Sequence, residues 1–203
     1  GIDIKGNGTV GLITYLRTDS TRISDEADQY AREYIGKTYG EEYVGEGQPK
    51  PKNDGKNIQD AHEAIRPSDV TRTPASVKDS LSRDQFRLYQ LIWKRFVASR
   101  MQAAKYETTS VKIGAGDYRF HVAASKIIFE GFRQVYVDAD EEKEKANVLV
   151  KSLDTSSVLE KESFDYQQHF TKPPAHYTEA GLVKTLEELG IGRPSTYAPT
   201  IST

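Results

Sequence analysis

Residues 11–24, GLITYLRTDSTRIS, are the stretch from which we predict how this chain is organised. The first half has the composition of a strand. In a strand, Tyr15 and Arg17 point to the same face because side-chain direction repeats every second residue. Short polar side chains follow at residues 18–21 and favour a turn or a helix start. A phenol and a guanidinium are therefore expected side by side near the end of a strand, where they can meet a phosphate.

The composition excludes several classes of protein. The chain has 203 residues, of which 36% are hydrophobic and 29% are charged, enough for one large domain or two small ones. No apolar run approaches the roughly 20 residues of a membrane span, so we expect no membrane partner. The absence of cysteine excludes disulfides and thiolate metal sites and fits a cytoplasmic protein. The four histidines are scattered, which predicts no zinc site made by this chain alone.

The charge of the chain limits how it can meet nucleic acid. Its formal net charge is −2, which argues against a simple cationic coat for DNA or RNA. A nucleic-acid function would therefore need locally placed arginines and lysines, or basic partner domains outside these residues.

Two helices are predicted in the first half of the chain. Ser24 is an N-cap candidate followed by acidic residues, and one of the next two glycines closes that helix. Ser82 and Gln85 form a capping box for a second helix over residues 82–103. Its broad aromatic and aliphatic stripe is expected to pack in the core and to stabilise this half of the chain.

Between these helices, residues 41–58 have the glycine, proline and charge content of an exposed loop. The sequence AHEAIRP follows at residues 61–67. Pro67 disfavours helix at Arg66, so any helix here is short. If one turn forms, His62 and Arg66 lie on the same face.

The second half predicts an antiparallel β module over residues 105–167, followed by short helices. Alternating strands flank a turn at residues 114–117, and residues 138–147 form a charged connector. The expected strands are residues 106–113, 118–124, 126–137 with a possible bulge at Gly131, 148–153 and 158–166. Thr178 then caps a helix that Gly190 closes, and a glycine-flanked turn leads into a second helical segment. The fold class is therefore α+β.

Three groups of residues can carry chemistry, and each has a plainer interpretation. A nucleophilic tyrosine needs a nearby positive charge or a base, because a free phenol with a pKa of about 10 is almost wholly protonated at neutral pH. Arg17 can supply that charge beside Tyr15; otherwise the two are an ordinary strand tyrosine and a solvated arginine. His62 with Arg66 can bind or protonate a phosphoryl group; otherwise the histidine only caps a short helix.

The third group lies in the turn GIGRPST at residues 190–196. Backbone N–H groups there, with Arg193, Ser195 and Thr196, can hold a phosphate. The alternative is a helix-turn-helix corner without a ligand.

Three long motifs occur together in this order: GLITYLRTDSTRIS, AHEAIRPSDV and HFTKPPAHYTEAGLVKTLEELGIGRPSTYA. Together they closely resemble bacterial DNA topoisomerase I, of the type IA family, and the resemblance extends over essentially the whole chain. It implies that Tyr15 attacks a DNA phosphodiester and becomes linked to the 5′ phosphate. It further implies that Arg17 positions the scissile phosphate and stabilises its charge.

The resemblance assigns further residues to the site. It implies that His62 assists phosphate binding or proton movement, and that Arg193, Ser195 and Thr196 contact the backbone of single-stranded DNA. Arg66 is implied either as a phosphate contact or as a structural residue. The expected activity is an isomerase that relaxes negatively supercoiled DNA and reseals it without ATP, in the bacterial cytoplasm at the nucleoid.

The resemblance also implies an architecture. Family members are toroidal and built from several domains. Residues 1–104 resemble the mixed α/β tyrosine domain, residues 105–167 part of the β-rich arch, and residues 168–203 the start of a helical domain at the base of the gate. The family's Mg²⁺ site and its general-acid glutamate and lysine lie in a Toprim domain, which these residues do not contain.

We therefore expect a fragment without a cofactor or metal of its own, whose partners are DNA, chiefly single-stranded, and the Toprim domain of the same polypeptide. We also expect that it does not relax DNA alone. Two alternatives within the family are topoisomerase III and reverse gyrase. Outside enzymology, the alternatives are a non-catalytic DNA-binding module and an arch segment with a mechanical role.

Overall fold

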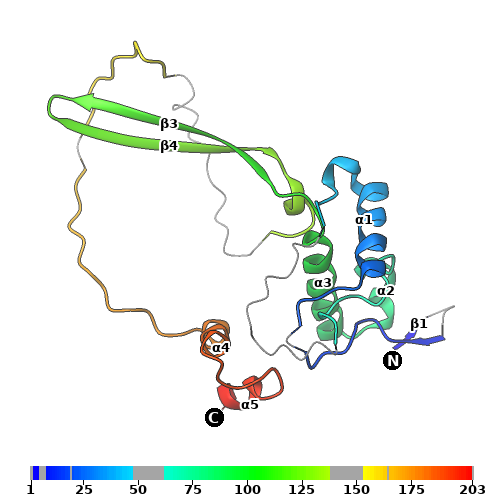
Figure 1. Ribbon diagram of the computed structural model, residues 1–203. Helices are drawn as coiled ribbons and strands as arrows, with labels where there is room; N and C mark the ends of the chain where they lie inside the picture. Colours follow the sequence, from blue (N-terminus) through cyan, green and yellow to red (C-terminus); the bar gives the residue numbers. More distant parts are fainter. Residues whose placement is uncertain are drawn as a thin grey trace. The chain divides into compact units, whose positions relative to one another are not determined.

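The structure is a computed structural model that describes residues 2–4, 8–18, 20–47, 62–137, 153–163 and 165–202. It mixes helices with antiparallel strands, which confirms the α+β expectation (Figure 1). In chain order the elements are β1 (Ile2–Ile4), β2 (Gly8–Val10), α1 (Asp25–Tyr39), η1 (Glu41–Tyr43), α2 (Pro74–Val77), η2 (Lys78–Ser80), α3 (Arg83–Ala98), β3 (Lys105–Ala115), β4 (Tyr118–Phe129), η3 (Gly131–Gln134), α4 (Glu179–Glu188) and α5 (Tyr197–Ser202).

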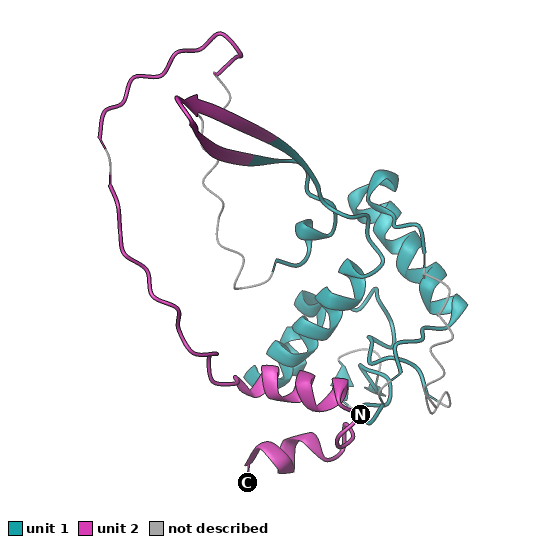
Figure 2. Ribbon diagram, turned by 60° about the vertical axis from the view of Figure 1, so that its left-hand side comes forward, with its two compact units in different colours: residues 1–108, 125–146 teal, residues 109–124, 147–203 magenta. Residues whose placement is uncertain are grey.

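The chain divides into two compact units (Figure 2). The first comprises residues 1–108 and 125–146, and the second comprises residues 109–124 and 147–203. Within the described residues, no helix has both the length and the apolar character that crossing a membrane requires.

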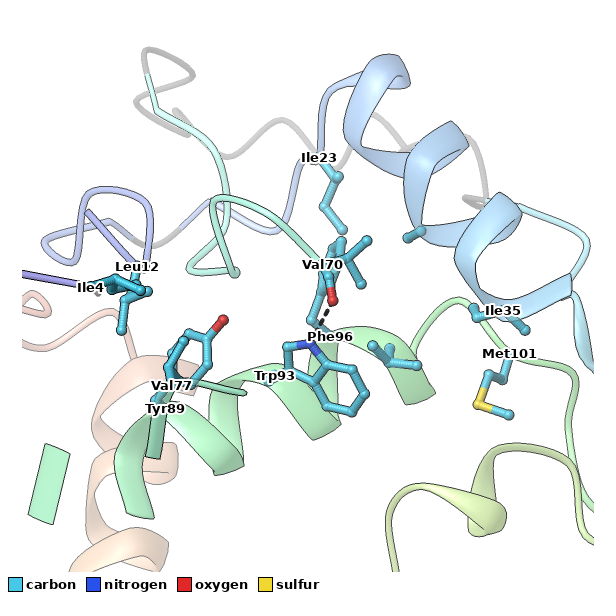
Figure 3. Packing of buried hydrophobic residues seen from close by; sticks show 12 residues of the cluster. Ile4, Leu12, Ile23, Ile35, Val70, Val77, Tyr89, Trp93, Phe96 and Met101 are labelled. Carbon is cyan, nitrogen blue, oxygen red and sulfur yellow. Dashed lines mark hydrogen bonds between the residues drawn. The ribbon is translucent and has the colours of Figure 1, made fainter. Parts of the chain in front are cut away.

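The hydrophobic core of the first unit is built mainly on α1 and α3 (Figure 3). Ile35 of α1 and Val97 of α3 are completely buried. The aromatic stripe predicted for the second helix lies in this core, where Tyr89, Trp93 and Phe96 are buried together. Burial of such large apolar side chains supplies the main stabilising free energy of the unit, at about 25 cal/mol per Å².

Both helix starts follow the predicted caps. The Ser24 hydroxyl accepts from the Ala27 N–H at 3.4 Å. At α3 the capping box is complete, because Ser82 Oγ accepts from Gln85 N–H at 3.3 Å and Gln85 Oε1 accepts from Ser82 N–H at 3.0 Å. Each bond satisfies a backbone donor that the first helical turn leaves without a partner.

α3 ends at Ala98, not at residue 103 as predicted. The chain beyond it pairs with the end of η1 and the residues that follow: Gly45 N–H donates to Arg100 C=O at 2.8 Å, and Gln102 N–H donates to Tyr43 C=O at 2.8 Å. A Cβ at Gly45 would lie 2.6 Å from the Arg100 oxygen, so only glycine permits this approach. Tertiary pairing therefore replaces the last predicted turn.

The predicted strand through Tyr15 is wrong. β2 ends at Val10 and pairs with β1 in the register Ile2↔Val10 and Ile4↔Gly8. Beyond it, Ile13 forms only a single antiparallel bridge with Pro67, and residues 14–17 belong to no strand. The alternation of residue types in this stretch predicted β-type pairing, which Ile13 does form. It did not predict that the pairing ends before Tyr15.

The β module contains the predicted hairpin. β3 and β4 form a two-stranded sheet, and a two-residue connection at residues 116–117 makes them antiparallel. Gly116 has φ +60° in this turn, a conformation that suits glycine. Thr108 and Ser125 are joined across the sheet by a hydroxyl–hydroxyl bond of 2.9 Å.

The later strands of the module are not as predicted. β4 ends at Phe129, and η3 replaces the strand expected up to residue 137. Gly131 is not a bulge: it has φ +52°, and a Cβ there would lie 2.5 Å from the Gln102 oxygen. Among the described residues of 158–166 there is no strand, and of the strand expected at 148–153 all but Leu153 lies outside the described residues.

In the second unit, Thr178 caps α4 as predicted, because its hydroxyl accepts from Gly181 N–H at 3.1 Å. Gly190 follows with φ +70°. A short α5 then begins at Tyr197. The helix–turn–helix order predicted for this end is confirmed.

Replacing Ile35 by Ala tests the core. We expect the free energy of unfolding to fall by about 2–5 kcal/mol, because a fully buried side chain is cut back and leaves a cavity. Leu88→Ala is the matched control on α3. Its side chain is 56% exposed, so the change should stay within about 0.5 kcal/mol. Urea unfolding of both variants measures the difference, and equal losses would contradict the assigned core.

Stability should fall at alkaline pH through Tyr89. Burial, aided by the charge of Asp69, raises the pKa of the Tyr89 phenol to about 12, while Arg72 opposes the shift. A phenol whose pKa is raised on folding stabilises the fold below pH 10, and this contribution is lost as the pH rises towards 12. A shift of this size corresponds to roughly 2–3 kcal/mol. Tyr89→Phe should therefore flatten the decline of unfolding free energy between pH 10 and 12.

Candidate active site

Tyr15 and His62 are brought together by the fold. Their ring centroids lie 4.6 Å apart with the ring planes inclined at 35°, so the imidazole lies against the phenol ring. Tyr15 is 53% exposed and His62 is also exposed. A large external substrate can therefore reach the phenol while its ring is held from one side.

The backbone around Tyr15 is fixed by pairing with the segment that carries His62. Thr14 N–H donates to Arg66 C=O at 3.0 Å, and Ser68 N–H donates to Leu12 C=O at 2.9 Å. Pro67 lies opposite Ile13, at the position of the ladder that requires no N–H. Pro67 therefore disfavours a helix in this segment, and the pairing loses no hydrogen bond through its missing N–H.

The side chain of Thr14 bonds to the same segment. Its hydroxyl donates to Ala64 C=O at 2.8 Å and accepts from Arg66 N–H at 3.0 Å. Ala64 N–H donates to Arg22 C=O at 2.7 Å. The residues that follow His62 are therefore hydrogen-bonded to Thr14 and to Arg22, and the short helix considered for His62 and Arg66 is not formed.

Glu63 and Arg66 form an ion pair beside this pairing. Arg66 Nε donates to Glu63 Oε2 at 2.8 Å, and a second guanidinium nitrogen lies 2.6 Å from the same oxygen. Partial burial alone would raise the pKa of Glu63, but hydrogen bonds from Arg66 and Ser24 and the charges of Arg66 and Arg22 outweigh it and lower the pKa. The bond from Ser24 connects this segment to the start of α1.

Arg66 itself is largely engaged within the protein. Besides the contacts with Glu63, its third guanidinium nitrogen donates to Pro67 C=O at 3.0 Å, and its side chain is only 14% exposed. A phosphate contact by Arg66 stays a prediction, and such a contact would have to compete with Glu63.

Arg17 lies two residues beyond Tyr15 and is exposed, as is Leu16 between them. Thr18 Oγ1 then accepts from Ser20 N–H at 3.0 Å, and Ser20 Oγ accepts from Arg22 N–H at 3.2 Å. These bonds form the polar turn predicted after Arg17. They define the path of the chain from the site to α1.

The predicted phosphate-binding turn lies in the second unit. Arg193 N–H donates to Thr196 Oγ1 at 2.9 Å, and the Thr196 hydroxyl donates to Arg193 C=O at 3.0 Å. Arg193, Ser195 and Thr196 are all exposed. The turn is thus internally hydrogen-bonded and accessible, and its placement next to Tyr15 stays a prediction.

A cavity of about 910 Å³ is lined by residues of α1 and by residues 66–72. Tyr30, Tyr34, Arg66 and Ser68 are among its lining residues, whereas Tyr15, Arg17 and His62 are not. The candidate active site is therefore an exposed surface and not this cavity. That geometry suits a polymer better than a small molecule.

The described residues do not fit a metal ion. Among them, no group of three or more histidine, cysteine, aspartate or glutamate residues lies together in a way that could hold one.

Comparison with known proteins identifies the family. The family model for DNA topoisomerase matches residues 8–203. The chain is also similar to the solved structure of full-length topoisomerase I from Thermotoga maritima, with 39% sequence identity and a TM-score of 0.71. That similarity covers 97% of this chain and 31% of the Thermotoga protein. The chain belongs to the DNA topoisomerase family, in its bacterial type IA branch.

Sequence reasoning did not single out Thr14 or Glu63, and it assigned Ser24 only as a helix cap, although all three help to hold the segment of His62 in place. The i,i+3 spacing of Glu63 and Arg66 was a usable signal for their ion pair. Nothing local could have shown the bonds of Thr14, because its partners lie 50 and 52 residues away.

Acid should weaken this site through Glu63. Because its pKa is lowered on folding, the ionised carboxylate stabilises the fold above pH 4.5, and this contribution is lost as the pH falls through the folded-state pKa. Glu63→Gln should therefore be less stable than the parent at pH 6, and the two should converge towards pH 3. Chemical unfolding at both pH values measures this, and a gap that does not narrow would contradict it.

Proposed function

We propose that this chain supplies the nucleophile of a reaction that relaxes negatively supercoiled DNA by transient cleavage of one strand. The observation that carries the proposal is the exposed Tyr15 phenol held against His62 at the end of a hydrogen-bonded pairing. Membership of the topoisomerase family supports it. The site is open, as a site for a DNA strand must be.

The proposed step exchanges one phosphate ester for another. Tyr15 Oη loses its proton and attacks the phosphorus, the bond from phosphorus to the 3′ oxygen breaks, and the 3′ oxygen takes up one proton and leaves as a hydroxyl, so that no net proton is gained or lost. The DNA on the 5′-phosphate side is now bonded to Tyr15. After strand passage the 3′ hydroxyl attacks the same phosphorus and releases the phenol. Because each step replaces one phosphate ester bond by another, the number of ester bonds does not change and resealing needs no ATP.

Each neighbouring side chain has a defined task in this proposal. Arg17 is exposed and can donate two N–H groups to the scissile phosphate, offsetting the charge that grows in the transition state. His62 lies against the phenol ring, so its imidazole is proposed to bind the phosphate that Tyr15 attacks. Holding His62 beside the phenol lowers the entropy lost on reaching the reactive geometry.

DNA binding is assigned to two places. Arg193, Ser195 and Thr196 are proposed to contact the backbone of a single-stranded segment, and Arg66 is proposed as a further phosphate contact. Mg²⁺ and a proton donor are expected from a Toprim domain, within a toroidal enzyme of the bacterial cytoplasm. The residues of this chain alone are therefore proposed not to relax DNA.

Two other identities are distinguishable by experiment. Topoisomerase III and reverse gyrase would share the tyrosine chemistry and differ in the outcome on plasmid DNA. A non-catalytic DNA-binding module would bind single strands through residues 193–196 without forming any covalent bond.

The decisive test is covalent capture of DNA. The chain is mixed with a type IA Toprim domain, Mg²⁺ and a labelled single-stranded oligonucleotide, and denatured samples are examined for protein-linked label. We expect an adduct that carries the label of the 3′-side product, whose 5′ phosphate is bonded to Tyr15, and no adduct with Tyr15→Phe. Tyr30→Phe, at a tyrosine of similar exposure in α1, should retain it.

An adduct that persists in Tyr15→Phe would show that the nucleophile is misassigned. Binding of the oligonucleotide without any adduct would favour the non-catalytic module. Relaxation of supercoiled plasmid by the chain alone would contradict the proposed need for other domains.

A further inference from the structure

Thr14 interrupts a backbone ladder one residue before Tyr15. The bridge between Ile13 and Pro67 is antiparallel, so Thr14 and Arg66 should form the next hydrogen-bonded pair and exchange two backbone bonds. Thr14 N–H does donate to Arg66 C=O at 3.0 Å. Arg66 N–H instead donates to the Thr14 hydroxyl, also at 3.0 Å. The side chain thus takes the place of its own carbonyl.

The same hydroxyl also occupies the next acceptor. In a regular ladder, Ala64 C=O would accept from the N–H of residue 16, but here it accepts from the Thr14 hydroxyl at 2.8 Å. One side chain therefore uses both groups that would have continued the pairing. Residues 15–17 leave the ladder at this point, and their side chains are exposed.

The contact between Tyr15 and His62 follows from where pairing stops. Thr14 adjoins Tyr15, and its bonding partner Ala64 lies two residues from His62, so both ends of the contact are tied to one hydroxyl. A hydroxyl with one donor and two acceptor sites can make both bonds at once. A continued ladder would instead direct residues 15 and 65 towards each other.

We propose that Thr14 is a positioning residue that sets the stacking of Tyr15 on His62, and thereby the rate at which Tyr15 attacks DNA. The effect on the rate of attack rests on the proposed function, whereas the effect on the contact between Tyr15 and His62 does not. Thr14 contacts no substrate in this proposal and acts only through the backbone that holds the two rings.

The experiment separates the structural effect from the chemical one. In Thr14→Val both side-chain bonds are lost at nearly equal volume, whereas Thr14→Ser keeps the hydroxyl. By NMR, we expect the ring-current shifts of the His62 imidazole protons to collapse in Thr14→Val and to persist in Thr14→Ser. In the covalent-capture assay, Thr14→Val should form adduct about 100-fold more slowly, because displacement by about 1 Å has effects of that size. Thr14→Ser should stay close to the parent rate.

Thr73→Val is the matched control for stability. Thr73 caps α2 by accepting from Ser76 N–H at 3.3 Å, so its loss lowers the melting temperature without altering the His62 signals or the adduct rate. If Thr14→Val does not fold, Thr14→Ala gives the same comparison, because it also removes the hydroxyl and adds no new group.

Unchanged His62 signals in the folded Thr14 variant would overturn the inference, as would an adduct rate equal to the parent's despite altered signals. An adduct that survives Tyr15→Phe would instead defeat the proposed function, and the NMR comparison would still decide whether Thr14 places the two rings.

Discussion

The hydrogen-bonded pairing of residues 12–14 with residues 64–68 is the constraint on which the rest of the site depends. It ends at the hydroxyl of Thr14, whose partners Ala64 and Arg66 lie 50 and 52 residues further along the chain. Because Pro67 lies where the ladder needs no donor, the pairing accepts a residue that prevents helix formation. The pairing thereby determines which face Tyr15 presents and which ring lies against it.

The pairing is supported from beneath by the aromatic face of α3. Trp93 Nε1–H donates to Val70 C=O at 2.9 Å (Figure 3). The Tyr89 hydroxyl donates to Arg72 C=O at 2.6 Å. These side chains bury their rings and use their polar atoms to hold the segment that follows Ser68. Core packing and site geometry are therefore coupled through the same two residues. An ion pair of 2.9 Å between Asp28 and Arg100 further joins α1 to the end of α3.

The arrangement suits a nucleophile that must act on a polymer. A buried tyrosine could not reach a DNA strand, and a freely moving one would lose entropy on every attack. Here the phenol is half exposed, while the preceding residue, Thr14, is hydrogen-bonded to the partner segment. The neighbouring Glu63–Arg66 ion pair lies within the partner segment and is largely shielded from solvent. Rigidity therefore comes from the backbone, and access comes from ending the ladder at Thr14.

The sequence by itself determined the family, the caps at Ser24, Ser82 and Thr178, the hairpin turn and the core face of α3, because each depends on residues close together in the chain. It overextended α3 and the strand through Tyr15, and it predicted strands at residues 130–137 and 158–166 that the described residues do not form. Only the tertiary structure decided where α3 and the pairing before Tyr15 end. The close approach of Gly45 to Arg100 ends the first, and the side-chain hydrogen bonds of Thr14 end the second. The stacking of Tyr15 on His62 belongs to the same class: it depends on partners about 50 residues away, which no local pattern encodes.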